Sequence, residues 1–159
     1  MMSRSLSETG DNSKLLVAME RARERKFADF IDFLAGFIAE LNRLAAEGCV
    51  VLVEGVRDVR AMRGVGYRGD IMSVSSVKRK ESESLLTVSK RVIIMTDLDP
   101  EGRRLAARFA KSFTHRGLSI SLDQRRRLLL ASRGVFRHIE NLKRFSQLMA
   151  DVEVQGAEI

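Results

Sequence analysis

Apolar residues follow two different spacings along this chain, and the way the spacings alternate predicts the fold. Continuous runs rich in β-branched residues at 49–54, 71–74, 91–96 and 118–122 have the length and composition of strands buried on both faces, as in a parallel sheet. Between these runs the apolar residues recur every three or four positions, which is typical of helices with one buried face. The predicted fold is therefore α/β: a mainly parallel, four-stranded sheet flanked by helices, with extra N- and C-terminal helices.

The segments outside the sheet differ in composition from the central domain. The first residues are polar and are expected to be disordered, and a stripe of apolar residues from Phe27 to Leu44 then predicts one helix. This stripe is expected to pack on the sheet, with a second subunit (a homodimer) or another protein partner as the alternative. The predicted parts are a disordered N-terminus (1–13), an N-terminal helix (14–48), the α/β domain (49–122), a basic helical extension (123–150) and a loose tail (151–159).

Acidic residues directly follow two of the predicted strands. Glu54 ends the first strand, and Asp97 and Asp99 end the third. Because the carboxyl ends of parallel strands meet at one edge of a sheet, these carboxylates are expected to converge. Oxygen ligands suit Mg²⁺ or Mn²⁺, and such an ion can bind a phosphodiester and stabilise its reacting oxygens. Each acid also has an ordinary interpretation, since Asp99 precedes Pro100 as a helix N-cap and the other two suit the solvated ends of strands.

Two short motifs together resemble the signature of the Toprim domain. The first is Glu54-Gly55 with Asp58 three residues further on, and the second is Thr-Asp-Leu-Asp-Pro-Glu-Gly at 96–102. The resemblance covers about residues 49–122. Toprim domains are shared by topoisomerases, bacterial-type primases, overcoming-lysogenization-defect nucleases, recombination-repair proteins and the endonuclease that matures 5S ribosomal RNA. Because the gate domains of topoisomerases and the zinc-binding domains of primases are missing, the chain looks most like the small, stand-alone archaeal Toprim proteins grouped with that endonuclease.

The resemblance implies a role for each matched residue. Glu54 corresponds to the glutamate that serves as general acid/base or as a metal ligand, and Asp97 and Asp99 correspond to the aspartates that bind Mg²⁺. Asp58 matches a further acidic position. Two glycines match those that let backbone and substrate approach closely: Gly55 and Gly102.

The chain is strongly basic, with a net charge of +7 and a pI of about 10.2, which indicates an anionic partner such as a nucleic acid. The aromatic content of 6% is too low for an evident base-stacking surface. Recognition of the backbone and shape of a structured RNA is therefore favoured over sequence reading, with DNA as the alternative. The candidate nucleic-acid contacts are Lys78, Arg79, Lys80, Arg103, Arg104, Arg125, Arg126 and Arg127.

One cysteine and two histidines cannot build a disulfide framework or a zinc cluster, so a reducing cytoplasm is the expected compartment. The polar N-terminus has no signal-peptide core, and no apolar run is long enough to span a bilayer. The expected function is Mg²⁺-dependent cleavage of structured RNA, as in rRNA maturation, with Glu54 as acid/base. The alternatives are a non-catalytic RNA- or DNA-binding module and a subunit of a larger DNA repair or replication complex.

Overall fold

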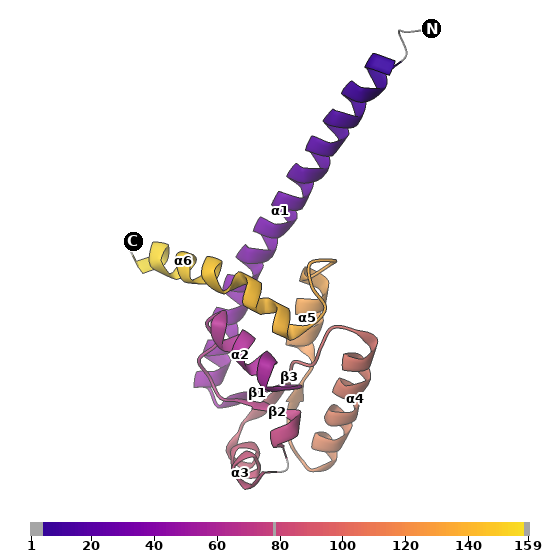
Figure 1. Ribbon diagram of the computed structural model, residues 1–159. Coiled ribbons are helices and arrows are strands. Elements are labelled where there is room, and N and C mark those ends of the chain that lie inside the picture. Colours follow the sequence, from indigo (N-terminus) through magenta and orange to yellow (C-terminus); the bar gives the residue numbers. More distant parts are fainter. Residues whose placement is uncertain (1–4, 78, 158–159) are drawn as a thin grey trace.

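Four parallel strands form the centre of the protein in the computed structural model, which describes residues 5–77 and 79–157 (Figure 1). Their spatial order is β2-β1-β3-β4, and Val51 of β1 pairs with Ile71 on one side and with Ile93 on the other. The expected α/β fold is confirmed, and the two central strands are those that precede the acidic residues. The strands are β1 (Cys49–Val53), β2 (Ile71–Ser73, followed by a 3₁₀ turn, η1, Val74–Ser76), β3 (Arg91–Ile94) and β4 (Ile120–Ser121).

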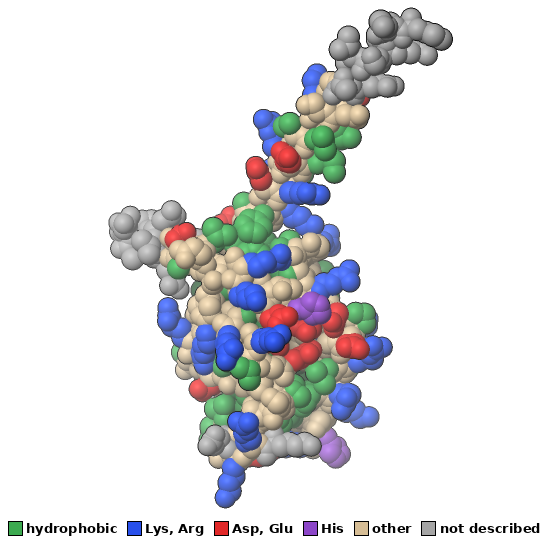
Figure 2. Space-filling view, in the orientation of Figure 1, with side chains coloured by type: hydrophobic (Ala, Val, Ile, Leu, Met, Phe, Trp, Pro, Cys, Tyr) green, Lys and Arg blue, Asp and Glu red, His purple; other side chains and the backbone are tan. Residues whose placement is uncertain are grey.

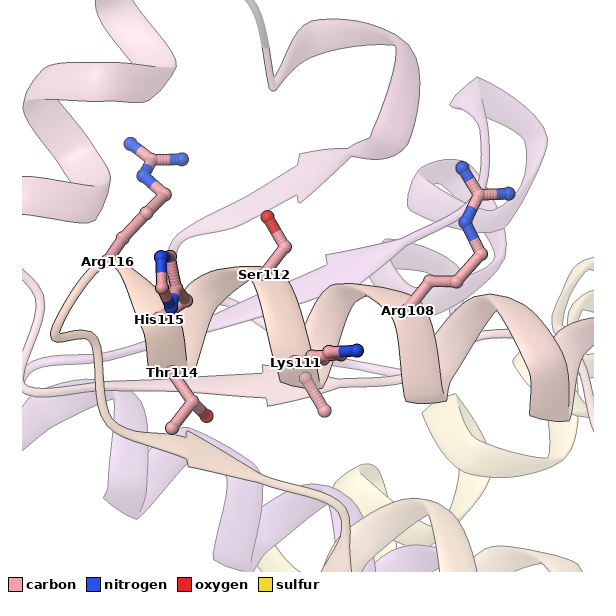
Figure 3. Close-up of a pocket in the computed structure, with 7 residues that line it drawn as sticks. Arg108, Lys111, Ser112, Thr114, His115 and Arg116 are labelled. Carbon is pink, nitrogen blue, oxygen red and sulfur yellow. The ribbon is translucent and has the colours of Figure 1, made fainter.

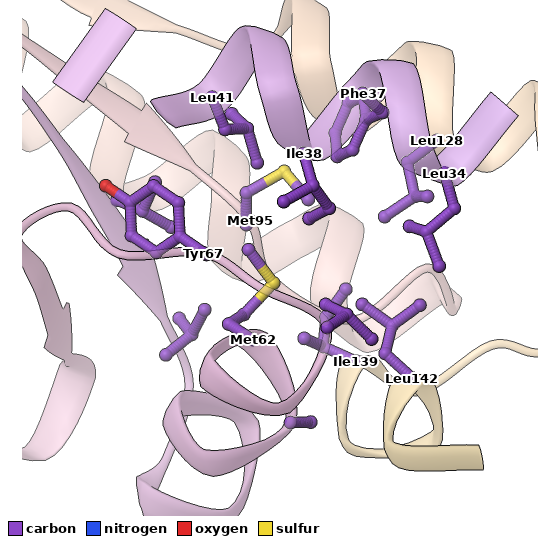
Figure 4. Close-up of a cluster of buried hydrophobic side chains, with 14 of the residues drawn as sticks. Leu34, Phe37, Ile38, Leu41, Met62, Tyr67, Met95, Leu128, Ile139 and Leu142 are labelled. Carbon is purple, nitrogen blue, oxygen red and sulfur yellow. The ribbon is translucent and has the colours of Figure 1, made fainter. Parts of the chain in front are cut away.

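Both faces of the sheet are covered by helices. Successive residues of a strand point to opposite faces, so the continuous apolar runs of the central strands contribute to a core on each side. Val51 and Ile93 belong to one hydrophobic core, and Val50 and Val92 belong to another. Figure 4 shows part of the first core, in which side chains from distant segments of the chain meet. The first core is covered by α1 (Ser5–Ala46), α2 (Val56–Gly64) and the 3₁₀-helix η2 (Ile139–Phe145), and the second by α3 (Lys80–Val88) and α4 (Pro100–His115).

The N-terminal helix α1 is longer than expected and projects away from the domain (Figure 1). It begins at Ser5, where the sequence predicted disorder through residue 13. No proline interrupts it, and residues with good helix propensity dominate its length. Its C-terminal part, from Phe30 to Leu41, packs in the first core, so the apolar stripe contacts the sheet as expected. Among the described residues, no helix has the length and apolar character needed to cross a membrane.

The C-terminal region differs from the expected helical extension and loose tail. It contains α5 (Asp123–Ala131), η2 and α6 (Ser146–Ala157). Gly134 interrupts the helix with a positive φ of 70°. Ile139, Leu142 and Phe145 then lie three residues apart, and all three are fully buried. A spacing of three matches the period of a 3₁₀-helix, which explains how η2 buries all of them against the first core.

Candidate metal centre

Glu54, which follows β1, contacts the loop after β3 that carries Asp97 and Asp99. β1 and β3 are hydrogen-bonded neighbours, with Leu52 paired with Ile94. Beyond the paired residues, the backbone amide of Asp97 donates to Oε1 of Glu54 over 3.1 Å. The carboxyl ends of the two strands therefore bring the Glu54 carboxylate into contact with the backbone of Asp97, at the edge of the sheet where the sequence predicted that the acidic residues meet.

Both aspartates use one carboxylate oxygen for a backbone hydrogen bond. Oδ1 of Asp97 accepts from the Ile139 amide over 2.8 Å, and Oδ1 of Asp99 accepts from the Gly102 amide over 2.7 Å. Asp99 is thus the N-cap of α4, with Pro100 behind it. In each aspartate the other oxygen, Oδ2, faces the same neighbour.

That neighbour is His138, which the sequence analysis did not identify. Its Nδ1 lies 3.3 Å from Oδ2 of Asp97 and 3.7 Å from Oδ2 of Asp99. One ligand atom from each of these three residues lies within 4.8 Å of the others. Ligands at about 2.1 Å from an octahedral ion are about 3.0–4.2 Å apart, and both distances from Nδ1 of His138 to the aspartate oxygens fall in this range, as a divalent cation requires. No spacing in the sequence links His138 to the acidic motif, because the two are brought together by η2.

Glu54 and Asp58 stand beside this cluster rather than in it. Burial raises the pKa of Glu54, and the negative charge of Asp97 adds to the effect. Asp58 is buried, and its Oδ2 accepts from the Gly55 amide over 3.0 Å, so it holds the start of α2. Burial also raises the pKa of Asp58. Neighbouring carboxylates at this edge of the sheet repel one another, and a bound cation would offset their negative charge.

The two matched glycines have different surroundings. A Cβ added to Gly102 would lie 1.9 Å from the carbonyl oxygen of Asp97, so no other residue fits there. The Gly102 carbonyl also accepts from Oγ1 of Thr96 over 2.7 Å. Gly102 therefore lets the start of α4 close against the acidic loop. A Cβ added to Gly55 would meet no atom within 4 Å, so its surroundings within the chain are open.

Arg125 lies in a different place from the surface contact that we expected. It is buried, with a relative exposure of 8%. Its Nε donates to Oγ1 of Thr96 over 3.1 Å, and its Nη2 donates to the carbonyl of Asp97 over 2.5 Å. Burial lowers the pKa of Arg125, and the nearby acids oppose that shift. Its guanidinium holds the acidic loop, and its side chain also lines the groove beside Asp99.

The other predicted basic contacts occupy several surfaces. Arg103 and Arg104 are exposed in the first turn of α4 and line a groove of about 510 Å³ beside Asp99. Figure 2 shows acidic side chains gathered with a histidine and with Lys and Arg around them. Arg127 pairs with Glu40 of α1 at 2.5 Å. The remaining predicted contacts are Arg126, Arg79 and Lys80, which are exposed, and Lys78, which lies outside the described residues.

A second hollow lies along the outer face of α4, toward its C-terminal end (Figure 3). Its lining includes Arg108, Lys111, His115 and Arg116 and no carboxylate. Arg116 is already paired with Glu83 of α3 at 2.7 Å. This hollow offers basic groups but no set of metal ligands, so the acidic edge of the sheet is the candidate site.

The parallel sheet, with carboxylates at the ends of its two central strands, is consistent with the fold of a Toprim domain. The Toprim family model matches residues 48–122. The chain belongs to the UPF0292 family, as its relatives show. It is 30% identical to a UPF0292 protein of Methanocaldococcus jannaschii over 116 residues, which cover 72% of this chain and 90% of the relative. It is also 30% identical to a UPF0292 protein of Pyrococcus abyssi over 106 residues, covering 67% and 80% of the two chains.

One solved structure shows the same fold. A protein from Aquifex aeolicus superposes with a TM-score of 0.56 at 23% identity, covering 67% of this chain and 94% of that one. At this level of identity the likeness concerns the fold alone. The Toprim domain itself points to metal-dependent activity on nucleic acids.

Proposed function

We propose that this protein is a metal-dependent nuclease that hydrolyses phosphodiester bonds in structured RNA, as in rRNA maturation. The observation that carries the proposal is the convergence of Asp97, Asp99 and His138 beside Glu54 at the carboxyl edge of the sheet. The donor atoms fit a divalent cation, Mg²⁺ or Mn²⁺, and basic residues border the site.

Each residue of the site has a role in this proposal. Oδ2 of Asp97 and Oδ2 of Asp99 would hold the cation, while their Oδ1 atoms stay fixed by backbone amides. When bound, the cation supplies charge stabilisation to a phosphodiester and its reacting oxygens. Glu54 is the general acid/base, because its Oε1 contacts the Asp97 amide beside the proposed metal ligands and burial raises the pKa of its carboxyl. Asp58 supports the loop of Glu54 from behind.

The groove beside Asp99 supports a nucleic-acid substrate. Arg103 and Arg104 project at its rim, where a helix N-terminus disfavours cations unless they serve another purpose. Their guanidinium groups suit phosphate oxygens. The aromatic content is only 6%, and most of the phenylalanines and the tyrosine are buried, so the chain has few side chains on which bases could stack. This favours contacts to the backbone and the shape of RNA over those to unpaired bases.

The test is cleavage of end-labelled structured RNAs and DNAs with Mg²⁺ or Mn²⁺. We expect the wild type to cut RNA only with metal, and Asp97→Ala to bind RNA without cutting it. Asp123→Ala is the matched control, because the side chain of Asp123 is 77% exposed on α5 and takes no part in the site. Cleavage that persists in Asp97→Ala would show that the proposed site is wrong, and cleavage of DNA alone would move the substrate class to DNA.

A non-catalytic binding module is the second candidate. The pKa of His138 is raised, chiefly by its hydrogen bond to Asp97. A protonated His138 would neutralise part of the acidic charge without any metal, which favours a module that binds nucleic acid only through its basic residues. Tight RNA binding that is independent of metal, with no cleavage by any variant, would support this candidate.

A further inference from the structure

We propose that His138 is a metal ligand and that it makes this centre select Mn²⁺ over Mg²⁺. The proposal deepens the proposed function and rests on its metal centre. Mg²⁺ binds almost entirely through oxygen, whereas an imidazole nitrogen suits first-row transition-metal ions. A site with two carboxylate oxygens and one imidazole nitrogen therefore favours Mn²⁺.

The position of His138 is fixed on both sides by the acidic loop. The carbonyl of Arg137 accepts from the Leu98 amide over 2.7 Å, and the Ile139 amide donates to Asp97 over 2.8 Å. The residues before and after His138 are thus tied to the strand-end loop that carries the aspartates. The imidazole is half-exposed, so nothing within the core requires its orientation. It nevertheless directs Nδ1 toward both free Oδ2 atoms.

Backbone hydrogen bonds also orient the two aspartates. Each has its Oδ1 engaged by a backbone amide, which leaves only Oδ2 to face His138. Behind the loop, Arg125 holds the carbonyl of Asp97. Hydrogen bonds of this kind, behind the ligand atoms, orient ligands for a metal ion. A simple ion pair between Asp97 and His138 would not need Asp99 to turn toward the same nitrogen.

The experiment measures Mn²⁺ and Mg²⁺ binding by the full chain in parallel, by calorimetry, for the wild type and His138→Ala. We expect His138→Ala to weaken Mn²⁺ binding by at least tenfold and Mg²⁺ binding far less. Electron spin echo spectroscopy of the Mn²⁺-loaded protein should show coupling to a nitrogen nucleus, and the substitution should remove it. The control is His115→Ala, which changes the other histidine, exposed at the end of α4.

The outcomes separate this inference from the proposed function. Unchanged Mn²⁺ binding in His138→Ala, or equal losses for both metals, would overturn the role of His138. A wild type that binds neither ion would overturn the metal centre itself and the inference with it. Nitrogen coupling that depends on His138, in a protein that cleaves no nucleic acid, would support the inference while the nuclease proposal fails.

A separate observation concerns the projecting part of α1. Every residue from 10 to 29 is exposed, including Leu15, Leu16 and Met19, whose exposed fractions are 59%, 61% and 48%. A helix gains most of its stability from packing an apolar face, and among the residues that the structure describes no other element covers this one. Leu15, Met19 and Ala22 share that face because they lie four and three residues apart.

We infer that this face binds a second copy of the chain in an antiparallel pair centred on Val17. In that register Leu15 lies opposite Met19 of the other copy, so the largest apolar side chains meet. Asp11 lies one turn before Leu15, and Arg23 lies one turn after Met19, so each Asp11 faces an Arg23 of the other copy. A parallel pair would place like charges together at both positions.

The test is the mass of the full chain by sedimentation equilibrium. We expect a dimer, with Leu15→Glu and Asp11→Arg each raising its dissociation constant at least tenfold. The double variant Asp11→Arg with Arg23→Asp should restore the dimer, since the pair of opposite charges is rebuilt. Val88→Glu is the control, because it charges an apolar residue that is 78% exposed on α3. A monomeric wild type, or a double variant no better than Asp11→Arg, would overturn the inference.

Discussion

Arg125 is the buried side chain on which the acidic loop depends, and replacing it with methionine should be costly. Arg125→Met keeps much of the aliphatic volume and removes the guanidinium that donates to Thr96 and Asp97. A hydrogen bond from a charged group contributes about 1.5–3 kcal/mol, and the acceptors left behind are buried or half-buried. Because such terms are not additive, we expect a loss of about 3 kcal/mol. For a chain of this size the melting temperature should fall by about 6–12 °C.

The assay is thermal unfolding followed by circular dichroism, together with Mn²⁺ titration of the folded protein. Arg126→Met is the matched control, because that side chain is 72% exposed and lies 4.0 Å from the carboxylate of the similarly exposed Asp123. A surface change of this kind should stay within about 0.5 kcal/mol. Arg125→Met should also weaken Mn²⁺ binding, since the backbone of Asp97 loses its support. Equal melting temperatures for the two variants would refute the reasoning, because Arg125 would then contribute no more than a surface arginine.

Three further predictions test the core and the loop. Tyr67 is the only tyrosine, and burial raises the pKa of its hydroxyl above the ordinary 10.0, so the unfolded chain releases this proton at a lower pH than the folded protein. The free energy of unfolding should therefore be unchanged below about pH 10 and fall by about 1.4 kcal/mol per pH unit above it, with phenolate absorbance rising only as the protein unfolds. Absorbance that rises around pH 10 in the folded protein would contradict this. Gly102→Ala should abolish metal binding measured by calorimetry, because the added methyl group would lie 1.9 Å from the carbonyl oxygen of Asp97 and force the acidic loop to move. Metal binding with wild-type affinity would show that the loop tolerates the methyl group. Leu142→Ala, at a fully buried side chain of η2, should cost about 2–5 kcal/mol in urea unfolding and weaken Mn²⁺ binding, whereas Leu148→Ala, at a side chain that is 38% exposed, should do neither.

Local sequence patterns were enough to predict the sheet, the acidic residues at the ends of its strands, and the meeting of Glu54 with the loop of Asp97. Buried strands read as continuous apolar runs wherever they occur, and a helix that starts with Asp99 and Pro100 needs no distant partner to be recognised. The contact between Glu54 and Asp97 then follows from β1 and β3 being neighbours. These features depend on residues that lie close together in the chain or on the general geometry of parallel sheets.

The C-terminal segment shows where such patterns fail. Its apolar residues suggested one amphipathic helix, yet Gly134 breaks the segment and a 3₁₀-helix follows. The choice between the two helix types is decided by the shape of the surface that receives Ile139, Leu142 and Phe145. That surface is assembled from α1 and α2, far away in the sequence.

The roles of Arg125 and His138 were also decided by the tertiary structure. In the sequence Arg125 is one of three consecutive arginines, and only the packing of α5 against β3 turns it inward to the acidic loop. His138 reaches the aspartates because η2 docks on α2 and leaves the preceding loop beside Asp97. By itself, then, the sequence determined the fold and its strand-end acids, whose patterns are local. The third donor and the support of the loop were decided only by the tertiary structure, because they depend on contacts between distant segments.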